Sequence, residues 1–441
     1  MNQTELRTAV IEMFHAALKA VDAQAAVQKA VSLQHSNLRV VDRQFDLTSR
    51  QLYAVAIGKA ALGMAKGLMK VLGSRISAGV ISAPNFEPDS TVFSQSWQVF
   101  SGGHPFPNTE SLAAAQATTK LLQNAEVDRA IVIFLISGGG SAALEWPSNP
   151  AITLEELIQA NRTLVLSGAT IGEINTVRRA LSAAKGGRLA LVAPSTTQVS
   201  LIISDVNPGE DALVASGPTM VTQTSELDPR KIVDRYELRH QFPESVMRTI
   251  DEVTDPVVAL PMEDLDQSHY VLLDNHSALE TIVAEARSRG FRTGLADDIV
   301  EQPIEAGCQL LLTRLQQLKH QTSEPVCLIS GGEFGCPVRG QGVGGRNLET
   351  ALRCALDLDK SAGAKNVLIF SGATDGIDGN SPAAGALADQ ATIARGRARS
   401  LDAKKFLAES DSFSFFHQLG DAIITGPTGT NVRDVRIILS N

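Results

Sequence analysis

The stretch Ala130-Ile-Val-Ile-Phe-Leu-Ile-Ser-Gly-Gly-Gly-Ser-Ala-Ala-Leu144 decides the fold class. Its first half is a short run of β-branched and aromatic apolar residues, which is typical of a strand buried on both faces in a parallel sheet. The run stops at Ser137 and three glycines. Glycine at the end of such a strand lets the backbone come close to a ligand. We therefore expect an α/β fold with a ligand site at this strand end.

The same design recurs twice in the C-terminal half, at Val326-Cys-Leu-Ile-Ser-Gly-Gly-Glu333 and at Val367-Leu-Ile-Phe-Ser-Gly-Ala-Thr-Asp-Gly376. Any single copy is explained about equally well by an ordinary tight turn after a strand. Three copies favour one cleft that is lined by strand ends.

Length and charge limit the classes of function. A chain of 441 residues is long enough for two domains, each with a large core. Its 44% hydrophobic and 20% charged residues are those of an ordinary globular protein. The net charge of −9 argues against a general nucleic-acid binder, which needs a basic face. An anionic small substrate remains compatible, provided that basic residues are concentrated locally.

The sequence also predicts where the protein works. No basic segment followed by an apolar segment opens the chain, and no apolar run approaches the length of a membrane span. The four cysteines show no C-x-x-C spacing, so they are expected to be reduced thiols and not a zinc site. We expect a cytoplasmic protein without membrane or nucleic-acid partners. Its oligomeric state, monomer or homodimer, is left open.

The order of strands and helices predicts two domains. It weakens at residues 221–265, which contain several prolines and scattered charges, and then resumes. We predict a larger Rossmann-like α/β domain at residues 1–225, a linker with a few helices at 226–265, and a smaller α/β domain at 266–441.

Two candidate site residues follow strands of the N-terminal half. Lys59 comes after the apolar segment 52–57, and the loop is not a Walker loop because Gly63 is followed by Met64 and Ala65. Open α/β sheets bind ligands at the carboxyl ends of their strands, although a solvated surface position is the commonest fate of a lysine. His104, between a glycine and a proline, is expected to face a cleft or solvent.

Carboxylates end two further strands. Asp205 closes the buried segment 199–204, where a charge is costly unless it is hydrated, paired or bound to a cation. It is therefore a candidate Mg²⁺ ligand or general base, and a turn or helix cap is the alternative. Asp375 and Asp378 lie among glycines after the third Ser-Gly strand.

A glycine-rich loop, Arg339-Gly-Gln-Gly-Val-Gly-Gly-Arg346, leads into a helix. Free N–H groups and the positive dipole end at a helix start favour anions. The guanidinium of Arg346 can fork onto a carboxylate or phosphate, which strengthens the prediction of an anion site.

Together these residues suit phosphoryl transfer, which needs phosphate positioning, Mg²⁺ and cations near the developing charge. A carboxylate near the acceptor hydroxyl could take its proton. Hydride transfer would require a dinucleotide fingerprint with an acid about 20 residues further on. Here the next acids, Glu155 and Glu156, fall at the start of an expected helix. The fit to dinucleotide binding is poor.

Taken together, the ordered motifs resemble the MOFRL-type glycerate kinases, which make 2-phosphoglycerate and are often described as hydroxypyruvate reductases. The resemblance covers nearly the whole chain. It rests on Gly58-Lys59-Ala60, Gly103-His-Pro-Phe-Pro107, Leu135-Ile-Ser-Gly-Gly-Gly-Ser-Ala142, Ile174-Asn-Thr-Val-Arg178, Lys185-Gly-Gly187, Ile203-Ser-Asp-Val206, Ala215-Ser-Gly-Pro-Thr219, Ser330-Gly-Gly-Glu333, Gly344-Gly-Arg-Asn347, Thr374-Asp-Gly376 and Thr425-Gly-Pro-Thr-Gly-Thr-Asn-Val432.

The resemblance implies ATP-dependent phosphorylation of D-glycerate at its 2-hydroxyl, with ATP, Mg²⁺ and D-glycerate meeting between two α/β domains. Its smaller domain would contain the MOFRL region at about 326–436. The implied catalytic residues are Lys59, Arg346, Asp205 and Asp375, of which the two aspartates are metal ligand and base in an unsettled order. The implied ATP-binding residues are Ser137, Gly138, Gly139, Gly140, Ser141, Gly331, Gly332 and Glu333. The implied substrate-binding residues are Lys59, Arg346, His104 and Asn347.

The chain departs from the family pattern twice, with Phe334-Gly-Cys-Pro337 in place of threonines and Leu348 in place of glutamine. Both departures lie in the C-terminal half of the cleft, so the family pattern leaves open which polar contacts form there and which acceptor is chosen. Two alternative functions remain: NAD(P)H-dependent reduction of hydroxypyruvate, and non-catalytic binding of a sugar acid or nucleotide.

Overall fold

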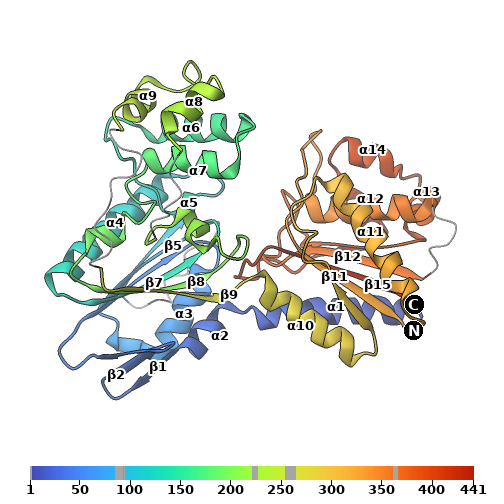
Figure 1. Ribbon diagram of the computed structural model, residues 1–441, viewed down its shortest axis with the longest axis horizontal. Coiled ribbons are helices and arrows are strands. Elements are labelled where there is room, and N and C mark those ends of the chain that lie inside the picture. The colour runs from blue at the N-terminus through green and yellow to red at the C-terminus, as the bar shows by residue number, and fades with distance from the viewer. Residues whose placement is uncertain (1, 85–92, 94, 221–226, 254–264, 361–365) are drawn as a thin grey trace. The chain divides into compact units, whose positions relative to one another are not determined.

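The chain forms two compact units, each built on its own sheet (Figure 1). The central unit consists of Ala23–Leu272, and the terminal unit joins Met1–Asp22 to Leu273–Asn441. The computed structural model describes residues 2–84, 93, 95–220, 227–253, 265–360 and 366–441.

This division differs from the boundaries expected from the sequence. Helix α1 (Gln3–Ala20) belongs to the terminal unit, because its buried face packs there and the ring centroid of Phe14 lies 4.6 Å from that of Phe370. Strand β9 (Gln267–Leu273), expected in the C-terminal domain, lies at the edge of the central sheet. Part of the expected linker, 254–264, lies outside the described residues.

The central sheet has six strands in the order β6-β5-β4-β7-β8-β9. The pairs β6–β5, β5–β4, β4–β7 and β7–β8 are parallel. Every residue of β4, β7 and β8 is buried, which confirms the double-sided burial expected of the segment at 130–137. The bounds are β4 (Leu52–Ile57), β5 (Ala78–Pro84), β6 (Trp97–Gly102), β7 (Ile131–Ser137) and β8 (Thr197–Ile203).

Helices cover both faces of the central sheet, with α3 (Ala61–Leu72) on one face and α4 (Thr109–Val127) on the other (Figure 1). The short α5 (Gly140–Ala143) directly follows β7. Beside α2 (Ala23–Ala30) lies a small antiparallel sheet that the sequence did not predict. Its strands are β1 (Val31–Gln34), β2 (Asn37–Val40) and β3 (Arg43–Asp46).

Four further helices share a core of their own in the central unit. They are α6 (Leu154–Leu166), α7 (Ile171–Ala180), α8 (Pro229–Arg235) and α9 (Glu244–Asp251). The helices expected in the linker are therefore part of a packed group.

The terminal sheet is mixed, with the order β10-β11-β15-β12-β13-β14. Strands β11 and β12 are both antiparallel to β15, so they run in the same direction and end at the same edge of the sheet. The first residue of β15, Asp434, pairs with Gly332 on one side and Ala373 on the other. The bounds are β10 (Arg292–Leu295), β11 (Val326–Gly332), β12 (Val367–Ala373), β13 (Gly385–Asp389), β14 (Ala422–Ile423) and β15 (Asp434–Ser440).

Helices also cover both faces of the terminal sheet (Figure 1). Helices α1 and α10 (Asn275–Ser288) pack on one face, and α11 (Ile304–His320) and α12 (Arg346–Lys360) on the other. The smaller helices are α13 (Thr392–Ala398), α14 (Ala403–Ala408) and α15 (Ser412–Leu419). Within the described ranges, no helix combines the length and the apolar character needed to span a membrane.

Candidate functional site

The carboxyl ends of β4, β7 and β8 lie side by side in the central unit. Ile57 pairs with Ile136, and Ser137 pairs with Ile203, so the three segments that follow these strands leave the sheet at adjacent positions. Lys59 follows β4 and Asp205 follows β8, with the three glycines after β7 between them in the strand order. Parallel pairing thus brings these three segments to one edge of the central sheet. The single cleft expected of the three Ser-Gly strand ends stays a prediction, because β7 belongs to the central sheet and β11 and β12 belong to the terminal sheet.

Gly58 and Ser137 join the first two of these segments. Gly58 has a φ of +107°, and a Cβ placed on it would lie 2.3 Å from the carbonyl oxygen of Ser137. The Lys59 N–H donates to the Gly138 carbonyl at 2.8 Å, and the Ala60 N–H donates to Ser137 Oγ at 3.0 Å. Ser137 Oγ donates in turn to the Ile57 carbonyl at 3.2 Å. The buried hydroxyl of Ser137, a predicted ATP-binding group, thus fixes the loop that carries Lys59.

Gly138 and Gly139 bring a cation, an imidazole and a carboxylate together. A Cβ on Gly138 would lie 1.7 Å from Asp205 Oδ2, so the carboxylate rests directly against this glycine. A Cβ on Gly139 would lie 3.0 Å from Lys59 Cγ and 3.6 Å from His104 Nδ1. We call Lys59, His104, Gly138, Gly139 and Asp205 the lysine cluster. Only residues without a side chain leave room for all three functional groups here.

The predicted Ser141 contacts a strained loop. Its Oγ lies 2.6 Å from Ser216 Oγ. The run 215–217 has φ values of 52°, 62° and 62°, which cost energy for its alanine and serine. The N–H groups of Gly186 and Gly187 donate to two carbonyls of this run, at 3.0 and 2.7 Å. The Lys185-Gly-Gly187 motif therefore supports the loop that contacts Ser141.

Lys185 itself is buried. Its side chain is 3% exposed and forms an ion pair with Glu145, whose side chain is 4% exposed. Burial lowers the pKa of Lys185, while Glu145 opposes the shift. Glu145 also accepts a hydrogen bond from Ser182 Oγ. The sequence did not indicate this pair, because its two residues lie 40 positions apart.

In the terminal unit, Arg346 is held between two carboxylates. Its Nε donates to Asp434 Oδ2 at 2.6 Å, and its Nη2 lies 2.8 Å from Glu333 Oε1. The side chain of Asp434 is 1% exposed. Burial alone would lower the pKa of Arg346, but Asp434 and Glu333 outweigh it and raise this pKa, so the guanidinium stays charged. We call Arg346, Glu333 and Asp434 the arginine cluster.

Asn347 and Asp378 secure the start of α12. Asp378 Oδ1 accepts the Asn347 N–H at 3.0 Å and its side-chain amide at 3.2 Å, while Oδ2 accepts the Leu348 N–H at 2.8 Å. Ser371 Oγ donates to Asn347 Oδ1 at 2.6 Å. Burial raises the pKa of Asp378 to about 7. Asn347, predicted to bind substrate, is buried with both polar groups of its side chain engaged, which favours a structural role.

The glycine-rich loop at 339–346 is explained by close packing. A Cβ on Gly342 would lie 2.3 Å from Asp411 Cβ, and one on Gly345 would lie 2.4 Å from Asp378 Cγ. The N–H groups of Gly342, Val343 and Gly344 donate to protein oxygens at 2.8, 3.0 and 2.8 Å. These three donors are thus engaged within the protein, and the anion site itself stays a prediction.

The other predicted residues of the terminal unit lie at strand ends. The carbonyls of Gly331 and Gly332 accept hydrogen bonds from the buried guanidinium of Arg436. Asp375 is half-buried, and its Oδ1 accepts the Ile377 N–H at 3.1 Å in a local turn.

The two departures from the family pattern face the core. Phe334 is 3% exposed, and the guanidinium carbon of Arg436 lies 3.6 Å from its ring centroid. Leu348 is fully buried in the core under α12. Both side chains thus make packing contacts, and their effect on the choice of acceptor stays a prediction.

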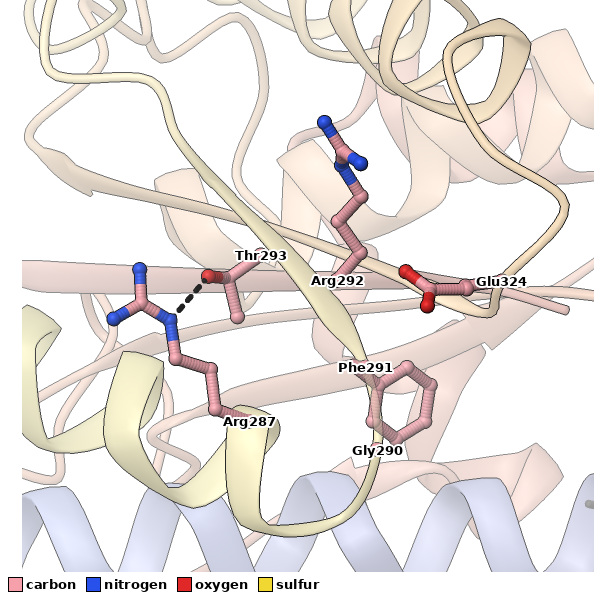
Figure 2. A pocket seen from close by; sticks show the side chains of 6 residues that line it. All are labelled: Arg287, Gly290, Phe291, Arg292, Thr293 and Glu324. Atoms are coloured by element: carbon pink, nitrogen blue, oxygen red, sulfur yellow. Dashed lines mark hydrogen bonds between the residues drawn. The ribbon is translucent and has the colours of Figure 1, made fainter.

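A cavity of about 390 Å³ lies elsewhere in the terminal unit. It is bordered by Arg287, Arg292 and Glu324, and Arg287 Nε donates to Thr293 Oγ1 at 3.0 Å (Figure 2). Arg292 pairs with Val326 at the start of β11, whereas Glu333 follows the end of that strand. The cavity thus lies at the opposite end of β11 from the arginine cluster, and it contains none of the predicted residues.

A Mg²⁺ ion in this protein would be held by only one or two protein carboxylates. Among the described residues, no three or more His, Cys, Asp or Glu side chains form a group that could hold a metal ion. Mg²⁺ in kinases is usually held by one or two carboxylates together with phosphate oxygens and water. Asp205, at a strand end and beside Lys59, has the chemistry of such a ligand.

Comparison with known proteins identifies the family. The family model described as a domain of unknown function, DUF4147, matches residues 9–251, and the MOFRL family model matches residues 326–434. The chain is 35% identical to a glycerate kinase of Rattus norvegicus, over 97% of this chain and 92% of that protein. It is 32% identical to a glycerate 2-kinase of Pyrococcus horikoshii, over 99% of this chain and 97% of that one.

Two solved structures support the same family assignment. A crystal structure of a glycerate kinase from Thermotoga maritima matches with a TM-score of 0.80 and 29% identity, over 99% of this chain and all of that chain. A crystal structure of a Pyrococcus horikoshii protein matches with a TM-score of 0.76 and 31% identity over the whole of both chains. The chain therefore belongs to the MOFRL-type glycerate 2-kinase family.

Proposed function

We propose that this protein transfers the γ-phosphoryl group of ATP to the 2-hydroxyl of D-glycerate, giving ADP and 2-phosphoglycerate. In this reaction the 2-hydroxyl oxygen forms a bond to the γ-phosphorus while the bond to the β,γ-bridging oxygen breaks. Membership of the glycerate 2-kinase family supports the substrates. The observation that carries the proposal is the lysine cluster, in which Asp205 lies against Gly138 and Lys59 lies against the neighbouring Gly139.

We assign the phosphate contacts first. Lys59, whose loop is fixed by Ser137, provides a cation beside a glycine pair that lets phosphate oxygens approach the backbone. Ser141 and the N–H groups around Gly139 and Gly140 would complete the nucleotide site. Arg346, kept charged by its two carboxylates, would bind the substrate carboxylate or the transferring phosphoryl group.

Asp205 has two possible tasks that one experiment separates. Its carboxylate can accept the proton of the 2-hydroxyl, or it can bind Mg²⁺, which supplies charge neutralisation at the phosphates when bound. In an Asp205→Asn variant, a raised half-saturating Mg²⁺ concentration with recovery at high Mg²⁺ identifies a ligand. A low kcat that high Mg²⁺ does not restore identifies a base. Asp375 is the second candidate ligand.

The protein is proposed to act in the cytoplasm, where its four cysteines would remain the free thiols that the structure contains.

A product assay tests the proposal. With Mg-ATP and D-glycerate, the protein should release ADP and form a product that enolase consumes directly, as 2-phosphoglycerate is. A product that needs phosphoglycerate mutase first would be 3-phosphoglycerate and would contradict the regiochemistry. Oxidation of NADH by hydroxypyruvate without any release of ADP would instead identify a reductase.

Replacement of Lys59 tests the site. Lys59→Ala should lower kcat/KM by about 10²-fold or more, because a preorganised charge at the phosphates is lost. The melting temperature should stay within about 4 °C of the wild type. The matched control is Lys66→Ala, an exposed lysine on α3, which should change neither quantity. A large fall in the melting temperature of Lys59→Ala, with no separate loss of kcat/KM in the folded protein, would show that Lys59 is structural.

A further inference from the structure

Two strand ends set the geometry of Arg346. Glu333 follows the last residue of β11, and Asp434 is the first residue of β15. The two strands pair there, with Gly332 opposite Asp434. The distance between the two carboxylates therefore depends on how this pair of strand ends is held. Because one guanidinium contacts both carboxylates, a shift of either strand end would turn the side chain of Arg346.

The side chain of Asn275 clamps both strand ends. Its Oδ1 accepts the Gly332 N–H at 3.2 Å. Its Nδ2 donates to the Val432 carbonyl at 2.7 Å and to the Asp434 carbonyl at 3.0 Å. A Cβ on Gly331 would lie 1.8 Å from Asn275 Oδ1, so the neighbouring glycine is what allows this close approach. One carboxamide thus joins the residue before Glu333 to the backbone of Asp434.

Asn275 is itself well anchored. It is the first residue of α10, whose N-cap Asp274 accepts the Ser277 N–H at 2.9 Å. Ala278 and Ile282 of the same helix are fully buried. The clamp is therefore attached to a packed helix, and the position of α10 is transmitted to the strand ends through three hydrogen bonds.

The contacts of Arg346 show that its orientation depends on the two strand ends that Asn275 holds. Asp434 and Glu333 engage its Nε and Nη2. Among the contacts of the described residues, none involves its Nη1. That nitrogen can donate to an anionic group of a ligand only if the other side of the guanidinium keeps its orientation.

We propose that Asn275 is a positioning residue for Arg346: it fixes the strand ends that carry Glu333 and Asp434, and so aims the guanidinium at the substrate. The inference rests on the proposed function, because that function gives Arg346 its task. Asn275 itself touches no reacting group. It lies in no motif of the resemblance, and it is 71 residues from Arg346 in the sequence.

The test combines Asn275→Asp with Arg346→Met. The aspartate keeps the size of the side chain and the acceptor for Gly332, but it turns a donor into an acceptor that faces two carbonyls. We expect Asn275→Asp to lower kcat by about 10- to 100-fold while the KM for ATP changes less than threefold. In the Arg346→Met background, the same substitution should change kcat less than twofold. Asn149→Asp in the central unit, whose amide donates to Thr249, is the matched control and should keep wild-type activity.

A second measurement does not depend on catalysis. In urea unfolding, Asn275→Asp should shift the midpoint less in the Arg346→Met background than in the wild type, because the ion pairs it disturbs are already absent. Equal shifts in both backgrounds would overturn the inference. Equal fold-losses in kcat in both backgrounds, or wild-type kcat in Asn275→Asp, would also overturn it. Wild-type protein without D-glycerate-dependent ADP release would refute the proposed function, while the unfolding result would still decide whether Asn275 and Arg346 are coupled.

Discussion

Gly138→Ala should separate activity from stability, because the obstacle that its methyl group meets is a functional side chain. The three atoms nearest to an added Cβ all belong to Asp205, with Oδ2 at 1.7 Å, Cγ at 2.2 Å and Oδ1 at 2.9 Å. Ordinary contacts begin at 3.4 Å, so the carboxylate must retreat by roughly 1.7 Å. Gly138 does not have a left-handed φ, so the backbone itself accepts alanine.

The energetic consequences differ for the fold and for the reaction. A side chain that leaves its preferred rotamer costs about 0.5–1.5 kcal/mol, which lowers the melting temperature by only a few degrees. A reacting group displaced by about 1 Å loses roughly 10²-fold in rate. We therefore expect kcat/KM for D-glycerate to fall about 100-fold or more, with a melting temperature within about 5 °C of the wild type. Enolase-coupled turnover and a thermal melt of the same preparation measure both quantities.

Two controls make this result decisive. Gly172→Ala adds a methyl group that meets nothing within 4 Å and should leave both quantities unchanged. In an Asp205→Ala background, Gly138→Ala should cause little further loss, because the displaced group is already gone. Near-normal turnover in Gly138→Ala, or an equal loss with and without Asp205, would refute the reasoning.

Three further substitutions test the buried groups. Lys185→Met should lower the free energy of unfolding in urea by about 3–5 kcal/mol, because Glu145 is left buried without its cation. The double variant Glu145→Gln/Lys185→Met should recover much of this loss. An unchanged unfolding midpoint in Lys185→Met would argue against the buried ion pair. Burial raises the pKa of Asp378 from 3.8 to about 7, so the folded state favours the protonated carboxyl. The stability that this preference contributes is fully present below about pH 4 and is lost as the pH rises through 7. The melting temperature should therefore fall more between pH 4 and pH 8 in the wild type than in Asp378→Asn, and parallel curves would contradict this assignment. Phe334→Ala should cost about 3–5 kcal/mol of stability while the KM for D-glycerate stays unchanged, whereas a large rise in KM would place Phe334 at the substrate.

The sequence predicts the middle strands of the central sheet well, because they are short and largely apolar and because glycine follows β4 and β7. Strands β4, β7 and β8 run close to the expected segments. Lys59 and Asp205 lie against neighbouring glycines because parallel strands end at one edge. Local pattern and topology point to the same answer here. The small sheet β1–β3 escaped prediction because its strands have four residues each and few apolar positions.

The supporting residues could not be found in this way, because their roles depend on register between distant segments. Asp434 reaches Arg346 only because the last strand of the chain inserts between β11 and β12. Asn275 contacts Asp434 across 159 positions, and Glu145 contacts Lys185 across 40 positions. No local spacing in the sequence indicates either contact. The glycines of the loop at 339–346 cannot decide between packing and anion binding, because both require the same absence of side chains.

The placement of α1 has a consequence for biosynthesis. The ribosome delivers this helix before the central unit, but its packing partners, Phe370 among them, emerge only after that contiguous unit has been made. At about 5–20 residues per second, translation of residues 23–272 takes roughly 12–50 s, during which the apolar face of α1 has no native surface to cover it. Nascent chains paused in that interval are the expected clients of a cellular chaperone. A shortened gene that starts at residue 273 would need the first 22 residues supplied as a separate peptide or fused through a linker.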